Sequence, residues 1–478
     1  MNYYFFGFLP YVFLATVSGA APSVAFNLAT ATVPALAFVA AAACGFVVSG
    51  RRSGAWLAGL LTQLTGTAYL LVRPGHFLAP NFDRFWASSR VIPEGINEYP
   101  VWTALFADLH AHFLSFPGFL LTFALLSVLF HRHRNRFAML FPLSLLLASQ
   151  YMSNTWEMPA LALLLVVALA LAFFHQSRGV VRATTFLVTA GVLAAILAWP
   201  FLVGQHLPRG AFFWEKGQAV SFGQYFELYG VHAGVFLLAL ACGWRHLAPR
   251  LRAWVLAAGL VAFAFVFGPR YLTLVDKMNS YFKLGLQAFL LLGACGGGLW
   301  AASLSPRPRW PRRLAQVLAA ALLVLGLVQA LWNTWAVVTT RRVPGPRPTL
   351  DGEAYLAQAQ PQVAAAVRVC KEESLSVLAE EASPPYADNL RLPMFCGAAA
   401  LVGWEYHLWQ RGKAYAEIRL RLYDLSVLLR GQPASLAQAL AHRYRLQALA
   451  GWEKPPGSLA GFAPVPETGG HLRVTAKP

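Results

Sequence analysis

Residues 314–338 read LAQVLAAALLVLGLVQALWNTWAVV and contain no charged side chain. An α-helix needs about 20 consecutive apolar residues to cross the hydrocarbon core of a bilayer. A helix also satisfies its backbone hydrogen bonds internally, as a lipid environment demands, so this segment is predicted to be a transmembrane helix. Further uncharged apolar runs occur at 161–174, 183–203, 253–267 and 284–302.

The composition of the whole chain agrees with this prediction. Hydrophobic residues make up 57% of the chain and charged residues only 12%, whereas soluble domains carry about 25% charged residues. We therefore predict an all-α polytopic membrane domain of about 10–11 transmembrane helices. The segment from Tyr3 to Ser18 is predicted to be an interfacial helix on the outer side, with an eleventh span as the alternative. The ten predicted spans are 28–49, 54–72, 104–130, 137–152, 158–174, 183–203, 232–247, 253–267, 281–302 and 314–338.

The net charge of +18 is distributed in a way that predicts orientation in a membrane and no binding to nucleic acid. Arginine clusters alternate along the chain with connectors that hold the acidic residues. The positive-inside rule places the arginine clusters in the cytoplasm and the acids on the outer face of the cell membrane. The clusters are Arg51 and Arg52; Arg132, Arg134 and Arg136; Arg178 and Arg182; Arg245, Arg250 and Arg252; and Arg307, Arg309, Arg312 and Arg313. The acids before residue 341 are Asp83, Glu94, Glu98, Asp108, Glu157, Glu215, Glu227 and Asp276.

A change of composition near Arg341 predicts a second domain. Three prolines follow at Pro344, Pro346 and Pro348, and the remaining acids of the chain come after them. Apolar residues at strand and helix spacing predict a small exported α/β domain, with a buried strand at 374–378 and helices at 358–371 and 414–429. The predicted divisions are a membrane domain at 1–340 with outer loops 73–107, 204–231 and 268–280, an exported domain at 341–454, and a disordered tail at 455–478.

The most conspicuous polar motif is Asp108-Leu109-His110-Ala111-His112, at the end of the longest outer connector. In a helix Asp108 and His112 would share a face, and in an extended segment Asp108, His110 and His112 would all point one way. Either geometry could hold a divalent metal such as Zn²⁺, Mn²⁺ or Mg²⁺. The alternatives are a phosphate held by histidine and Arg90, or histidines that hydrogen-bond to neighbouring loops.

Two other outer connectors carry candidate groups. Glu157 follows Asn154-Thr155-Trp156 and either belongs to a site or caps the positive end of the next helix. Lys283 enters a predicted span and could hold a lipid phosphate together with Arg270, or extend its amine to the membrane surface. The pairing of Cys370 with Cys396 in the exported domain is left open, because spacing alone cannot establish it.

The chain contains no glycine-rich phosphate loop, no H-E-x-x-H and no G-x-S-x-G in a strand-turn-helix context. A cytosolic ATP or NAD site is therefore not expected. A donor that acts on the outer face would have to arrive in the membrane, as a lipid-linked donor does.

Several blocks together resemble the YYY family of hydrophobic, uncharacterised membrane proteins of bacteria and archaea. The first is Asn2-Tyr3-Tyr4-Phe5-Phe6-Gly7, which is similar to the N-Y-Y-Y-F-G signature of that family. The other blocks are Ala25–Ala29, Ser89–Pro93, Ile96–Pro100, Asp108–His112, Asn154–Pro159, Met278–Gln287, Leu350–Gly352 and Gly403–Arg411.

That family looks like a distant branch of the GT-C membrane glycosyltransferases, which use a polyprenyl-phosphate sugar at the outer face. The resemblance implies a metal or acceptor role for Asp108, and contacts of Arg90, Lys283 or His112 with the donor phosphate. The candidate catalytic residues are then Asp108, Glu98 and His112, and the candidate metal ligands are Asp108, His110 and His112. The candidate substrate-binding residues are Arg90, Tyr3, Tyr4, Glu157, Lys283, Trp404 and His407.

The sequence departs from the family pattern at its start. Family members have a further span and an acidic D-P-W-type loop before the tyrosine block, whereas Met1 directly precedes Asn2 here. The expectation is a truncated start or a protein that lacks the step served by the first-loop acid. Milder departures are Ala111 in place of proline and Ser280 in place of threonine.

Two alternatives to a glycosyltransferase stay open. One is a transporter or flippase of a lipid-linked substrate, which would place acids in a cavity between helices. The other is a non-catalytic envelope scaffold that binds a partner through an aromatic cluster of the exported domain. That cluster comprises Trp404, Glu405, Tyr406, His407, Trp409 and Arg411.

Overall fold

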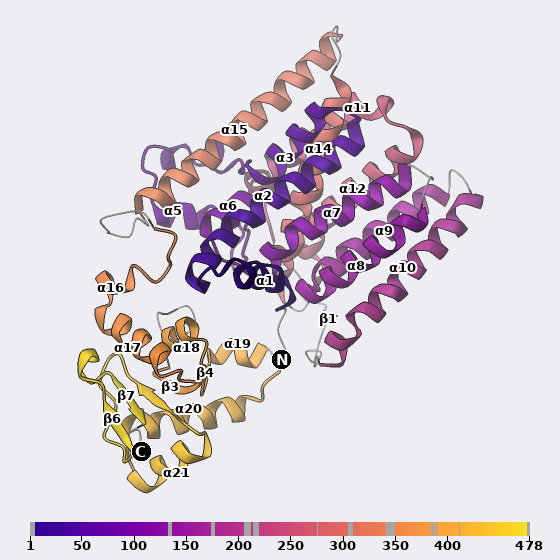
Figure 1. Cartoon of the computed structure of the whole chain (residues 1–478). Helices are drawn as coiled ribbons and strands as arrows, with labels where there is room; N and C mark the ends of the chain where they lie inside the picture. The colour runs from indigo at the N-terminus through magenta and orange to yellow at the C-terminus, as the bar shows by residue number, and fades with distance from the viewer. Residues whose placement is uncertain are drawn as a thin grey trace.

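The computed structural model shows a bundle of long helices with a smaller, sheet-containing domain beside one of its ends (Figure 1). This arrangement confirms the predicted fold class, an all-α polytopic membrane domain followed by a small α/β domain. The structure describes residues 5–131, 136–173, 177–204, 212–213, 219–274, 276–304, 309–340, 349–382, 384, 387, 390–410 and 412–475.

The membrane domain contains fifteen α-helices within the described residues, and seven helical segments are long and apolar enough to cross a membrane. Those seven contain α2, α7, α10, α11, α12, α14 and α15. The predicted spans at α8 and α9 form apolar helices that are shorter, so their crossing of the membrane stays a prediction. The helices are α1 (Leu9–Ser18), α2 (Pro22–Ser49), α3 (Arg52–Gln63), α4 (Tyr69–Val72), α5 (Phe82–Ala87), α6 (Pro100–Phe106), α7 (Ala111–His131), α8 (Arg136–Ser153), α9 (Glu157–Phe173), α10 (Ser177–Val203), α11 (Phe222–Gly243), α12 (Pro249–Phe267), α13 (Lys277–Asn279), α14 (Gly285–Ser303) and α15 (Trp310–Thr340). Two short strands, β1 (Phe212–Phe213) and β2 (Thr273–Leu274), pair antiparallel between the loops.

The predicted single span at 54–72 is wrong, because the helix is interrupted. α3 ends at Gln63, and α4 begins only at Tyr69. Within the interruption the Gly66 amide donates to the Gly326 carbonyl at 2.8 Å, and the Ala68 amide donates to the Glu227 carbonyl at 2.9 Å. Non-helical backbone is tolerated at membrane depth when protein groups satisfy it, and α11 and α15 supply these acceptors.

The predicted span at 104–130 is also divided. α6 ends at Phe106, and α7 begins at Ala111. Ala107 adopts a left-handed conformation with φ of 60°, which ends α6 and turns the chain before α7. The segment that carries Asp108 and His110 is therefore a tight connection between two helices.

α14 lies at the centre of the bundle, and all of its residues are buried. It packs against α2, α3, α11 and α12. Glycine permits the closest of these contacts: a Cβ atom at Gly297 would lie 2.3 Å from the backbone nitrogen of Ala58 in α3. A π-helical turn, Ser280–Leu284, precedes α14 and carries Lys283. Such turns occur frequently at functional sites.

α1 is apolar but short, and none of its residues is buried. Its 10 residues extend about 15 Å at a rise of 1.5 Å per residue, which is half of the hydrocarbon thickness. An interfacial position remains the prediction for this helix.

The C-terminal domain has one five-stranded sheet in the order β4-β3-β5-β7-β6. β3 pairs parallel with β4 and β5, whereas β7 pairs antiparallel with β5 and β6. Side chains alternate across the sheet: Leu378 packs in one hydrophobic core, while Ala379 packs in a second core on the other face. The elements are α16 (Leu356–Ala359), α17 (Pro361–Glu372), β3 (Val377–Glu380), α18 (Arg391–Cys396), β4 (Ala399–Ala400), α19 (Glu405–Gln410), α20 (Tyr415–Arg430), α21 (Ala434–Arg443), β5 (Ala448–Ala450), β6 (Phe462–Pro464) and β7 (Leu472–Thr475).

The prediction of a disordered tail at 455–478 is wrong for its described residues, which end at Thr475. β6 and β7 lie within this segment and complete the sheet. Leu472 is fully buried in one core of the domain, and Leu459 is buried in the other. Gly461, Gly469 and Gly470 lie in turns beside these two strands, which is why the composition of the tail resembled that of a disordered segment.

Candidate functional site

Polar side chains that are distant in sequence meet at one end of the helix bundle. Glu98 lies two residues before α6, His112 lies in the first turn of α7, and Lys283 lies in the π-helical turn before α14. All three are more than nine-tenths buried. Buried ionisable groups are energetically costly and are typically retained for function. We call Glu98, His112 and Lys283 the acidic-end cluster, because they lie at the end of the bundle that carries the acidic connectors, and they form the candidate site.

The cluster is joined by short contacts. Nζ of Lys283 lies 2.8 Å from Nδ1 of His112, and Nε2 of His112 lies 3.5 Å from Oε2 of Glu98. The Thr103 hydroxyl donates to the same oxygen of Glu98 at 3.0 Å. Nε2 of His112 is buried and makes no hydrogen bond within the described part of the chain. It is thus a polar atom that a bound molecule could satisfy.

Burial controls the ionisation of Glu98. Removal from water raises the pKa of this carboxyl from 4.5 to about 7, while the charges of Lys283 and Arg90 and the hydrogen bond from Thr103 act in the opposite direction. A carboxyl with a pKa near 7 can both accept and release a proton at neutral pH. That property suits a general base or acid.

Arg90 lies beside this cluster and is held by aromatic and polar contacts. Its guanidinium lies 4.1 Å from the ring centroid of Trp86. Nη1 donates to the hydroxyl of Ser89 at 2.7 Å and to its carbonyl at 2.8 Å. A stacked guanidinium is preorganised, and it loses less side-chain freedom on binding a phosphate than a mobile arginine would.

Glu157 is buried at the start of α9 within its own hydrogen-bond network. Its Oε1 accepts from Ser115 at 2.6 Å and from Asn154 at 2.9 Å, and its Oε2 accepts from Gln287 at 3.1 Å. This network is far more extensive than a simple helix cap. It also connects to the cluster, because Oγ of Ser115 lies 2.7 Å from the backbone carbonyl oxygen of His112.

The predicted metal set of Asp108, His110 and His112 is divided between two environments. Asp108 and His110 are exposed side chains whose Oδ2 and Nδ1 atoms lie 3.5 Å apart. His112 turns inward and presents Nδ1 to Lys283. Neither predicted geometry, helical or extended, therefore describes the motif. Among the described residues no group of three or more His, Cys, Asp or Glu side chains is arranged to hold a metal ion. Metal binding stays a prediction, and no step below depends on it.

The other predicted site residues lie outside the described part of the chain or in the C-terminal domain. Tyr3 and Tyr4 lie outside the described residues. Trp404 and His407 belong to the C-terminal domain, where their ring centroids lie 5.2 Å apart. Cys370 and Cys396 of the same domain are free thiols, and a hydrogen bond with the Cys396 side chain lowers the pKa of Cys370.

Sequence reasoning assigned no role to Ser115, Thr103, Asn154 and Gln287, which complete the hydrogen bonding of the two buried carboxylates. A signal for two of them was present. Ser115 follows His112 by three residues, and Gln287 follows Lys283 by four, so each shares a helix face with a predicted site residue. Uncharged polar residues at that spacing in an apolar span point toward the protein interior.

Comparisons with known proteins give a family and several structural neighbours. The model of a family described as uncharacterised membrane protein, DUF2298, matches residues 1–328. No curated protein matches the chain. A solved structure similar to the chain is the oligosaccharyltransferase of Archaeoglobus fulgidus tethered with an acceptor peptide, with 11% identity and a TM-score of 0.40. The match covers 89% of this chain and 57% of that protein, so the chain spans little more than half of its length.

Proposed function

The chain belongs to the DUF2298 family of uncharacterised membrane proteins, and we propose that it is a membrane glycosyltransferase that uses a polyprenyl-phosphate sugar as donor. The observation that carries the proposal is the buried contact of Lys283 with His112, beside Glu98. At one end of the membrane domain, this contact brings together an amine that can bind phosphate, that of Lys283, and a carboxyl that can take a proton, that of Glu98. The predicted orientation places that end on the outer face of the cell membrane.

In the proposed reaction, an acceptor hydroxyl attacks C1 of the sugar while the bond between C1 and the phosphate oxygen breaks. The leaving polyprenyl phosphate takes the bonding electron pair, and Glu98 takes the proton of the hydroxyl. Lys283 and Arg90 bind the phosphate, where preorganised positive charge stabilises the negative charge that develops. His112 positions Lys283 through its 2.8 Å contact.

The surroundings of Glu98 support its part in this reaction. Its pKa of about 7 allows it to accept a proton from the acceptor at neutral pH, and the proton remains on the carboxyl until it is lost to water. Asp108 is exposed at the same connector. It is proposed as a second carboxylate that faces the acceptor.

The test is an assay of the full chain in vesicles that contain a labelled polyprenyl-phosphate hexose. Release of polyprenyl phosphate is measured for wild type, for Glu98→Gln, and for the control Glu94→Gln, which alters an exposed acid of the same connector. We expect turnover in wild type and control, and a loss of about 10²-fold or more in Glu98→Gln. Unchanged turnover in Glu98→Gln would remove this residue from the mechanism.

A second variant tests the exposed carboxylate separately. Asp108→Asn is expected to abolish turnover while the chain remains folded. Normal turnover in Asp108→Asn together with loss in Glu98→Gln would restrict the acidic chemistry to the buried carboxyl. Absence of turnover in wild type with every donor of this class would contradict the proposal and favour the scaffold or the transporter.

A further inference from the structure

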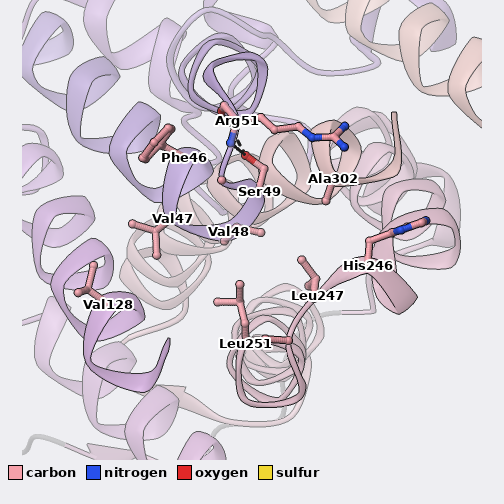
Figure 2. Close-up of a pocket in the computed structure, with 12 residues that line it drawn as sticks. Phe46, Val47, Val48, Ser49, Arg51, Val128, His246, Leu247, Leu251 and Ala302 are labelled. Atoms are coloured by element: carbon pink, nitrogen blue, oxygen red, sulfur yellow. Dashed lines mark hydrogen bonds between the residues drawn. The ribbon is translucent and has the colours of Figure 1, made fainter. Parts of the chain in front are cut away.

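A cavity lies at the arginine-rich end of the bundle, away from the acidic-end cluster. Its volume is about 700 Å³, and it forms where the ends of α2, α7 and α14 meet the start of α12 (Figure 2). Val128 of α7 borders it, 16 residues after His112 on the same helix. At 1.5 Å per residue that separation is about 24 Å, so the cavity is distinct from the proposed catalytic site.

The lining of this cavity is amphipathic, and among the described residues it carries basic side chains without an acid. Phe46, Val47 and Val128 form an apolar wall on the left of Figure 2, whereas Arg51 and His246 lie on the right. Leu247 and Leu251 extend the apolar surface below. A cavity with this lining fits a molecule that has a negative head and an apolar body.

Arg51 is positioned for an anion. Its Nη1 donates to the carbonyls of Ala301 at 2.9 Å and Leu304 at 2.7 Å, which fixes the guanidinium at the end of α14. Within the described part of the chain, no protein acceptor binds Nε or Nη2 of this side chain. An arginine that is held by one nitrogen and keeps its other donors available is suited to phosphate oxygens.

The backbone adds positive potential on another side of the cavity. α12 begins at Pro249, and Ala248 precedes it without a side chain that caps the helix. Ala248 and Leu251 both line the cavity. The amide groups in the first turn of this 19-residue helix therefore present their partial positive charge to the same space.

We propose that this cavity binds the headgroup phosphate of an anionic phospholipid, with Arg51 and His246 as its side-chain ligands. The acyl chains would lie along the apolar wall, where Phe46 is 49% exposed on the surface of α2. A lipid fits better than a soluble anion, because Phe46, Val47 and Val128 would otherwise border water.

The experiment uses the full chain, purified in a mild detergent and titrated with phosphatidylglycerol or phosphatidylcholine. Bound lipid is counted by native mass spectrometry. Wild type is compared with Arg51→Gln and His246→Gln, and with Arg52→Gln, which removes the same charge from the neighbouring exposed residue outside the cavity. We expect wild type and Arg52→Gln to retain one phosphatidylglycerol, and the two cavity variants to bind it about tenfold more weakly.

Three outcomes would overturn the proposal. Arg52→Gln could weaken binding as much as Arg51→Gln does, which would indicate diffuse surface attraction. Phosphatidylcholine could bind as tightly as phosphatidylglycerol, which would indicate a site without preference for an anionic lipid. Inorganic phosphate could displace the lipid at equal concentration, which would indicate a site for a soluble anion. Since Arg51 also holds the end of α14, His246→Gln decides the matter if Arg51→Gln fails to fold.

Discussion

Nζ of Lys283 lies 2.8 Å from Nδ1 of His112, and this contact joins two segments that are 171 residues apart in sequence. It brings the π-helical turn before α14 against the first turn of α7. Glu98 approaches the opposite edge of the same imidazole at 3.5 Å. A cation, an imidazole and a carboxyl thus form one buried row at the end of the bundle.

Lys283 is expected to determine donor affinity. Lys283→Met should raise the KM for a polyprenyl-phosphate donor by about tenfold or more, because a charge-assisted hydrogen bond is worth ~1.5–3 kcal/mol. Lys277→Met removes a positive charge from the same connector and serves as the matched control. The measurement is the KM in the vesicle assay.

The replacement Lys283→Arg separates charge from folding. Arginine keeps a positive charge beside the buried Glu98. Removing that charge, as Lys283→Met does, can by itself destabilise the protein. Donor affinity that is normal in Lys283→Met would show that the amine does not bind phosphate. Low affinity in Lys283→Met with partial recovery in Lys283→Arg would support the assigned contact.

The raised pKa of Glu98 predicts a pH dependence of stability. Between about pH 4.5 and pH 7 the folded state keeps a proton that the unfolded state has released, so stability falls as the pH rises through this window. Glu98→Gln stays neutral throughout and lacks this decrease. The measurement is Tm at pH 5 and pH 8, where the difference should be larger in wild type than in the variant. Equal differences would show that Glu98 ionises as an exposed carboxyl does.

Glu157 is expected to contribute strongly to stability. Glu157→Ala should lower the free energy of unfolding by about 3 kcal/mol, because it removes the buried carboxylate that accepts hydrogen bonds from Ser115, Asn154 and Gln287. The exposed Glu94→Ala is the control. A change well under ~1 kcal/mol in thermal or denaturant unfolding would instead indicate the simple helix cap that the sequence also allowed.

The last two strands should be essential to the C-terminal domain. A chain that ends at Pro456 lacks β6 and β7 and leaves the edge of β5 unpaired. Residues 349–456 should then become sensitive to limited proteolysis, because an exposed strand edge and an opened core replace a closed sheet. A chain that ends at Thr475 is the control. Equal resistance of the two truncated chains would restore the prediction of a disordered tail.

Local sequence signals were sufficient for the fold class and for some site residues. Long uncharged runs identify helices such as α15, since length and polarity alone decide whether a segment can lie in lipid. Charged side chains near a bilayer are energetically costly, and this principle alone predicts Glu98, Glu157 and Lys283 as site residues. These signals depend on single residues and their near neighbours.

Other features depend on partners that a single segment does not reveal. The interruption of the helix at Gly66 needs the Gly326 carbonyl, which lies 260 residues later in the chain. The motif at Asp108 and His112 appeared to be one group, yet a left-handed turn at Ala107 and the distant amine of Lys283 divide it. β6 and β7 are only 3 and 4 residues long, too short for alternation to distinguish them from turns.

The helix interruption has a mechanical consequence. Along two turns of α15, the Gly326 carbonyl binds Gly66, the Gln329 side chain binds the Leu70 amide, and Asn333 binds the Tyr99 hydroxyl. Tyr99 directly follows Glu98. A shift of α15 along its own axis would stretch all three hydrogen bonds together. α15 therefore holds in position the region from the interruption at Gly66 to Tyr99. Because Tyr99 is bonded to α15 and directly precedes α6, the position of α15 helps to set the position of the residue proposed to take the proton.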